Sequence, residues 1–286
     1  MTFEPFGDFA TRGYLRNVAK AKDPEIVQRL LHNSFLTGID AALAHLKAQK
    51  SLSYADVLQT HKMLFEAVFP WAGEDRHTNA SQIFVKKGSV IFAHPNDIRK
   101  AIDYALEKGQ DKAFMAEKLG EVMGYLAYGH PFLDGNGRTL MLIHAELARR
   151  AGFGIDWAAT DKDQYLVALT QELEGPGKGK LNAYLKPFIR KGSEMKEVGD
   201  AIKAAPGLDG SNADAVAGET SDPALKAQYE APGRKGLRTE GLRCSKTYCE
   251  SRSGDHDVRR QQTEPTIVSW PLSGSPRAKP PSFAVT

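Results

Sequence analysis

Apolar residues recur at helical spacing through most of the first two thirds of the chain. Asp23 followed by Pro24 is typical of a helix start, and Ile26, Leu30 and Leu31 then fall on one apolar face. Further helices are predicted at about 35–48, after Ser53, after Asn96-Asp97, at about 114–128, from near Arg138 to Gly152, after Asp161 and at 181–189. The pattern therefore predicts an all-α fold for this part of the chain.

Residues 82–93 interrupt the helical pattern. Two short runs rich in β-forming residues, 82–85 and 89–92, flank a turn at Lys86-Lys87-Gly88, and this arrangement predicts a β-hairpin. A lone hairpin is only weakly stable unless another element packs on it. A functional role and an ordinary surface ribbon therefore both remain open.

The character of the chain changes at about residue 191. Apolar periodicity disappears, and Pro, Gly, Ser and charged residues dominate, so residues 191–286 are predicted to form a low-complexity, mostly disordered tail. The two cysteines, Cys244 and Cys249, lie in this tail, and a single C-x4-C pair is a weak metal signal. The rest of the chain contains no cysteine and hence no disulfide framework, which is typical of a reducing cytoplasm.

Charge and hydropathy exclude several classes of protein. The net charge of the 286 residues is only +3, which argues against an electrostatic nucleic-acid binder. No basic stretch followed by an apolar run opens the sequence, and no run approaches the roughly 18 apolar residues of a membrane span. We therefore expect no membrane partner and a cytoplasmic location, with export by a route that needs no N-terminal signal left open.

Residues 130–138, with the sequence HPFLDGNGR, contain the candidate chemistry. Gly135, Asn136 and Gly137 permit positive φ and bring backbone N–H groups together just before a predicted helix. The helix N-terminus adds partial positive charge, and Arg138 adds a fork of donors that suits phosphate oxygens. The sequence therefore predicts an anion site that suits a pyrophosphate.

Two further residues turn this anion site into a candidate catalytic site. Asp134 would repel phosphates unless a cation lies between them, and Mg²⁺ held by one carboxylate and substrate phosphates is the usual solution. The imidazole of His130 can accept a proton from an attacking hydroxyl near neutral pH. Each feature alone is more often a helix cap or a turn, but together they predict phosphoryl transfer.

The loop closely resembles the Fic family signature H-x-F-x-[D/E]-G-N-G-R-x-x-R. The segment FPWAGEDR, residues 69–76, also resembles the Fic segment upstream of the hairpin. The resemblance covers residues 30–190 and implies an all-α Fic-type helical bundle with one β-hairpin, called the flap. Residues 1–29 would then be an N-terminal extension, and residues 191–286 the disordered tail.

The resemblance also implies an activity, which is protein adenylylation: transfer of AMP from ATP to a Tyr, Thr or Ser hydroxyl of a target protein. His130 would be the catalytic base and Asp134 the Mg²⁺ ligand. Phosphate groups would be bound by Gly135, Asn136, Gly137 and Arg138. The target protein would dock by adding a strand to the flap, whose docking residues would be Ile83, Phe84, Val85, Val90, Ile91 and Phe92.

The chain departs from the family at two places. Met141 replaces the second signature arginine, which in the family commonly binds the γ-phosphate, and Thr37 stands where an upstream inhibitory motif would have its glutamate. A formal match to that motif at residues 170–175 is interpreted as chance. The same fold transferring UMP or phosphocholine is therefore an alternative, as is a non-catalytic nucleotide-binding protein. Without an inhibitory glutamate, a separate antitoxin protein is a candidate partner.

Overall fold

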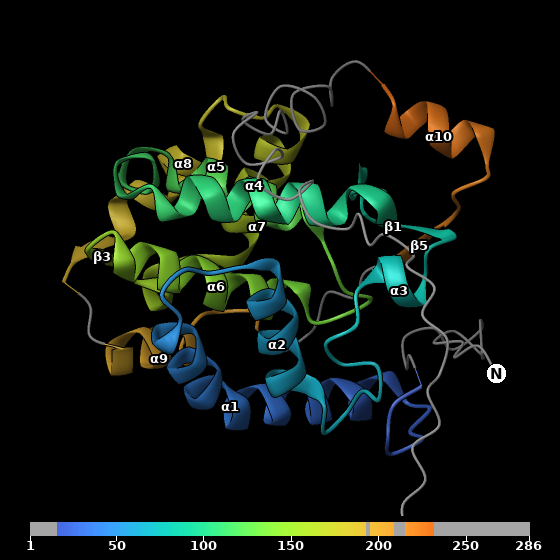
Figure 1. Ribbon diagram of the computed structural model, residues 1–286, viewed down its shortest axis with the longest axis horizontal. Coiled ribbons are helices and arrows are strands. Elements are labelled where there is room, and N and C mark those ends of the chain that lie inside the picture. Colours follow the sequence, from blue (N-terminus) through green and yellow to red (C-terminus); the bar gives the residue numbers. More distant parts are fainter. Residues whose placement is uncertain (1–15, 193–194, 209–214, 232–286) are drawn as a thin grey trace, which may run out of the picture. The chain divides into compact units, whose positions relative to one another are not determined.

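The computed structural model describes residues 16–192, 195–208 and 215–231, and most of these residues are helical (Figure 1). The helices are α1 (Pro24–Ala48), α2 (Tyr54–Phe65), α3 (Arg76–Asn79), α4 (Ile98–Gln110), α5 (Lys112–Gly129), α6 (Asn136–Arg150), α7 (Lys162–Glu174), α8 (Lys180–Leu185), α9 (Met195–Lys203) and α10 (Pro223–Tyr229). The strands are β1 (Ile83–Lys87), β2 (Val90–Ile91), β3 (Phe153–Ile155), β4 (Ile189–Lys191) and β5 (Ala215–Glu219). The predicted helical class is confirmed.

Side-chain caps fix the predicted helix starts. The Asp23 carboxylate accepts a hydrogen bond from the Glu25 amide at the start of α1, at 2.9 Å. Ser53 and Asp56 form a capping box on α2. Asp161 accepts from the Gln164 amide at the start of α7. These contacts satisfy amide groups that the first helical turn leaves without a partner, which is why polar residues before apolar runs predicted the starts well.

The predicted break near residue 35 is wrong, because α1 is one continuous helix. The Ser34 hydroxyl donates to the Leu64 carbonyl of α2 at 2.6 Å. Val27, Leu31 and Phe35 are buried along a single face, whereas the predicted Ile26 is exposed. Because the helix runs through residue 30, that residue is not a boundary in the fold.

Helix α6 lies between two helical layers (Figure 1). Helices α4 and α5 pack on one side of it, and α1 and α2 pack on the other. Almost every side chain of α6 between Asn136 and Ala148 is buried. Burying one leucine-sized side chain stabilises a fold by roughly 1.5 to 3 kcal/mol. The first turn of α6, which follows the 130–138 loop, is therefore held by the best-packed helix of the bundle.

The predicted hairpin is present, but it is part of a larger sheet. Strands β1 and β2 pair antiparallel, with Lys86 opposite Ile91 and Lys87 opposite Val90. Strand β5 pairs antiparallel with the other edge of β1. A second small sheet joins β3 to β4. The single predicted hairpin is confirmed, and the two further pairings, which join segments far apart in the sequence, were not predicted.

The prediction of a disordered tail from residue 191 is wrong for the described residues of that region. Helix α9 packs against α1 and α6, and its buried Ile202 belongs to the core. Strand β5 and α10 follow, and Tyr229 of α10 is also buried. Residues 232–286 lie outside the described part of the chain, so the prediction for them is not tested here.

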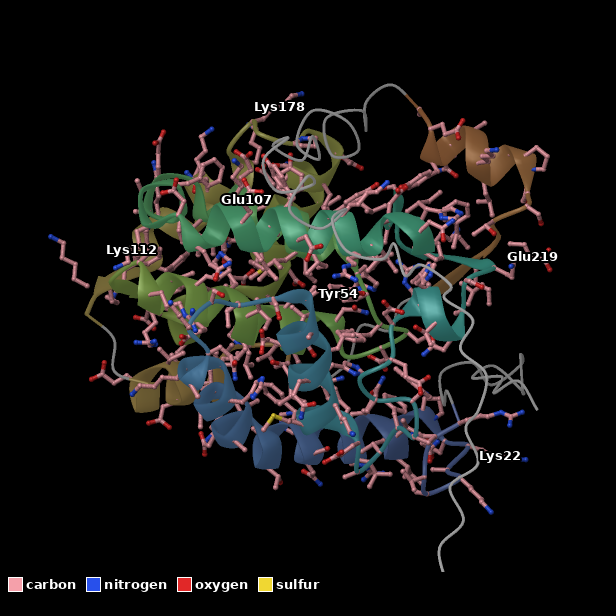
Figure 2. The ribbon with its side chains drawn as sticks, in the orientation of Figure 1. Lys22, Tyr54, Glu107, Lys112, Lys178 and Glu219 are labelled. Carbon is pink, nitrogen blue, oxygen red and sulfur yellow. The ribbon has the colours of Figure 1, made fainter. Side chains whose placement is uncertain are left out.

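Most charged side chains lie on the outside of these layers. Glu107, Lys112 and Lys178 are exposed and point away from the helices, whereas Tyr54 is buried (Figure 2). Within the described ranges, no helix is both long enough and apolar enough to cross a membrane.

Candidate active site

The candidate site begins where α5 ends. His130 takes a left-handed backbone conformation, with φ of 42° and ψ of 60°, and Pro131 follows it. A left-handed residue is a common helix end, and proline cannot continue the helix. The chain therefore turns sharply at His130 and enters the loop that leads to α6.

The imidazole of His130 lies flat against the ring of Phe92, at the end of the hairpin. The ring centroids are 3.6 Å apart and the planes differ by only 5°. The backbone carbonyl of His130 accepts a hydrogen bond from Nε of Arg76 at 2.8 Å. Side chain and main chain are thus both held, and the imidazole forms part of a cavity wall.

Arg76 connects three parts of the site. Its side chain is fully buried. Besides bonding His130, its Nη2 donates to the Ala93 carbonyl at 2.8 Å, and its backbone amide donates to the Pro131 carbonyl at 2.7 Å. The residue therefore ties the hairpin end and the beginning of the loop to one guanidinium.

Asn136 closes the loop on itself. Its Oδ1 accepts from the Phe132 amide at 2.8 Å, and its Nδ2 donates to the Phe132 carbonyl at 2.7 Å. Phe132 is fully buried. The predicted phosphate contact of Asn136 is accordingly left to its backbone amide, because the side chain holds the loop.

Gly135 has a φ of +80° and no room for a side chain. A Cβ there would lie 2.6 Å from a ring carbon of Phe65 and 3.1 Å from Nε2 of His61. As the N-cap of α6, Gly135 also has no side chain that could bond the first amides of the helix. These amides are left facing the cavity, which is the geometry of a helix N-terminal anion site.

His61 of α2 holds the loop through hydrogen bonds and ring stacking. Its Nε2 donates to the Asp134 carbonyl at 3.0 Å, and its Nδ1 accepts from the Gly73 amide at 2.9 Å. Its ring stacks on Phe132, with centroids 3.7 Å apart. Burial lowers the pKa of His61 to about 3, because water no longer solvates the charged form. His61 is therefore neutral and acts as a positioning residue.

Asp134 and Arg138 lie beside each other at the start of α6. Nη2 of Arg138 is 3.7 Å from Oδ1 of Asp134. The Arg138 guanidinium also lies over the ring of Phe65, at 4.8 Å from its centroid. The Asp134 side chain is 29% exposed, whereas that of Arg138 is 6% exposed. One carboxylate thus faces the cavity next to a guanidinium that is fixed in place.

A single cavity brings these groups together. One wall is the loop and the first turn of α6, and an apolar wall comes from α5, α6 and α7. The hairpin contributes Lys87 and Phe92, and residues 205–208 after α9 form a further part. The apolar wall contains Met123, Leu140, Met141, Trp157, Tyr165, Leu166 and Leu169.

The structure places all six predicted loop residues on this cavity, namely His130, Asp134, Gly135, Asn136, Gly137 and Arg138. The side chains of the predicted flap residues do not form an exposed docking surface. Of these, Ile83 is half-buried and the other five are buried in the core. Any docking on the hairpin would thus use its backbone edge, and target docking there stays a prediction.

Sequence reasoning missed the roles of His61 and Arg76. No role was predicted for His61, and Arg76 was predicted only as part of the family segment 69–76. A polar residue at a core position of α2 and an arginine directly before a hairpin were the available signals. The partner of His61 lies 73 residues away and that of Arg76 lies 54 residues away, so sequence spacing could not reveal these contacts.

Glu174, the glutamate of the formal inhibitory match, lies away from the phosphate loop. It accepts a hydrogen bond from the Ser89 hydroxyl at 3.0 Å, at the hairpin turn. The cavity lining includes no glutamate among the described residues. This placement agrees with the interpretation that the match arose by chance.

Two buried histidines predict a pH-dependent stability. Burial lowers the pKa of His61 to about 3 and that of His144 to about 4. The unfolded chain binds these protons below about pH 6.5 and the folded chain does not, so stability is complete above that pH and falls as the pH decreases toward 4. From pH 7 to pH 5, the free energy of unfolding should fall by roughly 2 kcal/mol for each histidine.

Urea unfolding at the two pH values measures this change. In the variant His144→Gln, the amide can still donate to the Leu119 carbonyl that His144 bonds at 2.8 Å. The pH dependence of that variant should be smaller by about half of the two-histidine effect. Equal stability of the unmodified chain at pH 5 and pH 7 would contradict the prediction.

Comparisons with known proteins agree with this geometry. Residues 51–148 match the model of the Fic/DOC family. Over 180 residues the chain is 27% identical to protein adenylyltransferase VbhT of Bartonella schoenbuchensis, covering 60% of this chain and 36% of that protein. It is also 27% identical over 195 residues to protein adenylyltransferase Fic of Nematostella vectensis, covering 64% of this chain and 43% of that protein.

The fold is also that of known structures. BepC of Bartonella tribocorum, solved with bound AMPPNP, superposes with a TM-score of 0.51 at 20% identity, covering 62% of this chain and 93% of that one. The N-terminal Fic domain of a Bartonella quintana effector, solved with bound ADP, gives 0.51 at 19% identity, covering 63% and 92%. The chain spans less than half the length of the two adenylyltransferases above.

Proposed function

We propose that this chain transfers a nucleotide, AMP from ATP, to a Tyr, Thr or Ser hydroxyl of a target protein. The observation that supports it best is one cavity lined by both the His130 imidazole and the open N-terminus of α6. The similarity to proteins named protein adenylyltransferases supports the same activity. A separate catalytic base and phosphate cradle in one cavity are what in-line phosphoryl transfer needs.

The cavity offers distinct surroundings for the two ends of a nucleotide. Phosphates would bind the backbone amides of Asn136 and Gly137 and the guanidinium of Arg138. The Gly135 amide would join them once it is released from Oδ1 of Asp134, to which it donates in this structure. The base would pack on the apolar wall, where the rings of Trp157 and Tyr165 meet edge to face at 5.8 Å. The neighbours with bound AMPPNP and ADP have the same fold, which supports a nucleotide as the ligand.

Magnesium fits this site only together with the nucleotide. The described residues contain no group of three or more His, Cys, Asp or Glu side chains that could hold a metal ion alone. Asp134 offers one carboxylate on the cavity, and Mg²⁺ commonly binds one or two carboxylates plus substrate phosphates. When bound there, Mg²⁺ would neutralise charge on the phosphate chain.

The reaction would then proceed as an in-line displacement. The imidazole of His130 accepts the proton of the target hydroxyl as its oxygen attacks the α-phosphorus of ATP. The new bond joins that oxygen to phosphorus, the bond to the β-phosphate oxygen breaks, and pyrophosphate leaves. Arg138 and the α6 amides stabilise the charge that develops on the phosphate oxygens. His130 later releases its proton to water.

Met141 bears on the choice of donor. It lines the cavity one turn after Arg138 and cannot contact a γ-phosphate electrostatically. UTP and CDP-choline are therefore alternative donors, which would add UMP or phosphocholine. A chain that binds nucleotide without turnover is the alternative from another class, and the placement of His130 and Asp134 on the cavity argues against it.

The proposed partners follow from the same site. A target protein would add an extended segment to the β1 edge, next to His130. Since no described glutamate lines the cavity, a separate antitoxin protein is proposed as a partner that restrains the enzyme. We place the chain in the bacterial cytoplasm, with secretion as an effector as the alternative.

A donor competition assay tests the function. The purified chain is incubated with Mg²⁺, a bacterial extract and equal concentrations of ATP, UTP and CDP-choline, and modified peptides are identified by mass spectrometry. We expect the added mass of AMP on Tyr, Thr or Ser. Addition of UMP or phosphocholine would change the donor, and nucleotide binding without any added mass would favour the non-catalytic alternative.

Removing the charge of Asp134 should abolish the dependence on Mg²⁺. Asp134→Asn keeps an oxygen that can accept from the Gly135 amide, as Asp134 does. We expect the transfer rate at saturating Mg²⁺ to fall at least about a hundredfold, because metal coordination is worth several kcal/mol in the transition state. Asp163→Asn, on the exposed first turn of α7, is the matched control. An Asp134→Asn chain that still responds fully to Mg²⁺ would rule out this ligand.

A further inference from the structure

The β1 edge on which a target strand would add is covered by the chain itself. Strand β2 pairs with one edge of β1, and β5 pairs with the other, with Ile83 opposite Glu219 and Lys86 opposite Ala215. The pairing continues past β5, because the Thr220 amide donates to the Gln82 carbonyl at 2.9 Å. Glu219 lies at the outer end of this ladder (Figure 2).

The outer edge of β2 is less suited to pairing with a target strand. That strand has only two residues, and the chain just beyond it is bonded to α5 through the Ala93 amide and the Tyr128 carbonyl at 2.9 Å. The long edge of the hairpin is therefore that of β1. It is also close to the catalytic base, since the Phe92 amide donates to the Val85 carbonyl and the Phe92 ring stacks on His130.

Tyr229 fastens the covering segment to the domain. Its hydroxyl donates to Oδ2 of Asp97 at 3.0 Å, so the 2.8 Å contact between the two tyrosine hydroxyls is donated by Tyr128. The backbone amide of His94 also donates to it, at 3.2 Å. The ring of Tyr229 lies 5.3 Å from that of Phe84, on β1 itself. Strand β5 is thus followed, within one short helix, by a buried anchor.

The covering strand has the wrong composition for an acceptor. Its five residues, Ala-Val-Ala-Gly-Glu at 215–219, include no Ser, Thr or Tyr. Thr220 does carry a hydroxyl, but its amide pairs with Gln82, three residues along the chain from Val85, the residue whose carbonyl bonds Phe92. An extended segment without a hydroxyl can pair with β1 but cannot receive a nucleotide. The same stretch of chain also reaches the nucleotide cavity, because residues 205–208 line it.

We propose that residues 215–219 act as an internal pseudosubstrate that occupies the target-docking edge of β1 until a target segment displaces it. This inference rests on the proposed function, since only a transferase needs that edge for an acceptor. The displacing partner would be an extended protein segment that carries a hydroxyl residue. Restraint would then come from competition for a sheet edge rather than from a glutamate in the nucleotide site.

Gly218 gives a way to release the strand without touching the catalytic loop. Its φ is +149°, and a Cβ there would lie 2.5 Å from Cδ1 of Leu225. A β-branched residue is strongly disfavoured at such a φ. Gly218→Val should therefore detach β5 in the full chain. Gly192→Val, at a φ of +65° with no atom within 4 Å of the added Cβ, is a strained control at the end of β4.

Hydrogen exchange measures whether the edge is covered. In wild type, the β1 amides should be protected. In Gly218→Val, peptides spanning residues 82–87 should exchange at least about tenfold faster, while protection of α5 and α6 stays unchanged. Gly192→Val should match wild type in β1. Equal β1 exchange in wild type and Gly218→Val would overturn the proposal. Tyr229→Phe, which keeps the ring and loses the hydroxyl bonds, should accelerate exchange of the same amides and serves as the second variant.

Transfer measures whether the strand competes. The acceptor probe is a synthetic peptide of residues 213–219 with Val216→Tyr, in which the tyrosine is the only hydroxyl side chain, added with ATP and Mg²⁺. Gly218→Val should modify it at least about tenfold faster than wild type, because the edge is free. Equal rates with an exposed edge would overturn the competition. A third outcome separates this proposal from the proposed function. If β1 exchanges faster in Gly218→Val but no donor is transferred to any acceptor, then β5 does cover β1, and the result counts against the proposed transferase activity.

Discussion

His130→Ala is expected to lower nucleotide transfer by a factor of about 10² to 10⁴, the usual contribution of a positioned general base. The imidazole lines the cavity beside the α6 N-terminus, and no other histidine among the described residues lines it. Binding of ATP should persist, because the phosphates are proposed to contact the α6 amides and Arg138. Transfer is measured with saturating donor, and binding by calorimetry.

The fold should survive this substitution. The variant loses the stacking of the imidazole on Phe92, which is worth roughly 1 kcal/mol, and alanine keeps the positive φ at a similar small cost. His77→Ala, at an exposed position of α3, is the matched control and should transfer at the wild-type rate. A folded His130→Ala chain with near wild-type transfer would show that another group takes the proton.

Much of the bundle is encoded locally, and these parts could be predicted. The caps at Asp23, Ser53 and Asp161 act within one helical turn, so the sequence around each is sufficient. The loop at 130–138 is also local, because its turn, its glycines and its arginine are adjacent in the chain. That is why the predicted catalytic and phosphate residues occupy one cavity, and why the matching segment 51–148 includes the whole loop.

The parts that could not be predicted depend on distant partners. Residues 215–219 have weak β propensity, and they form a strand because β1 presents an open row of amides and carbonyls. Phe153–Ile155 and Ile189–Lys191 form strands for the same reason, although the second lies at the end of a predicted helix. The break predicted near residue 35 is absent from α1, where the Ser34 hydroxyl donates to a carbonyl of α2.

Both the local sequence of the loop and contacts with distant residues shape the site. The loop supplies groups that act on a substrate, and distant residues fix where those groups stand. His61 and Arg76 contact no part of the proposed substrate, and each bonds a backbone carbonyl of the loop. The same loop without these two residues would keep its reactive groups but would not hold them in place. Through these two residues the fold therefore affects function.

Removing the guanidinium of Arg76 should therefore reduce both stability and transfer. Arg76→Met preserves most of the side-chain volume but leaves the buried carbonyls of His130 and Ala93 without their donor, each now bonded at 2.8 Å. An unsatisfied buried polar group costs about 1 to 3 kcal/mol, so we expect the free energy of unfolding to fall by roughly 2 to 5 kcal/mol. Arg99→Met, where the side chain is 61% exposed, should change it by less than about 0.5 kcal/mol.

Kinetics separate positioning from stability. At a temperature where Arg76→Met is fully folded, the transfer rate should still fall by about a hundredfold, because a shift of about 1 Å in a catalytic group can cost that much. KM for ATP should change little, since Arg76 contacts the hairpin and the start of the loop rather than the phosphate amides. If the folded variant transfers at the wild-type rate, Arg76 stabilises the domain without placing the imidazole, and the hold on His130 comes from its other contacts, including its stacking on Phe92.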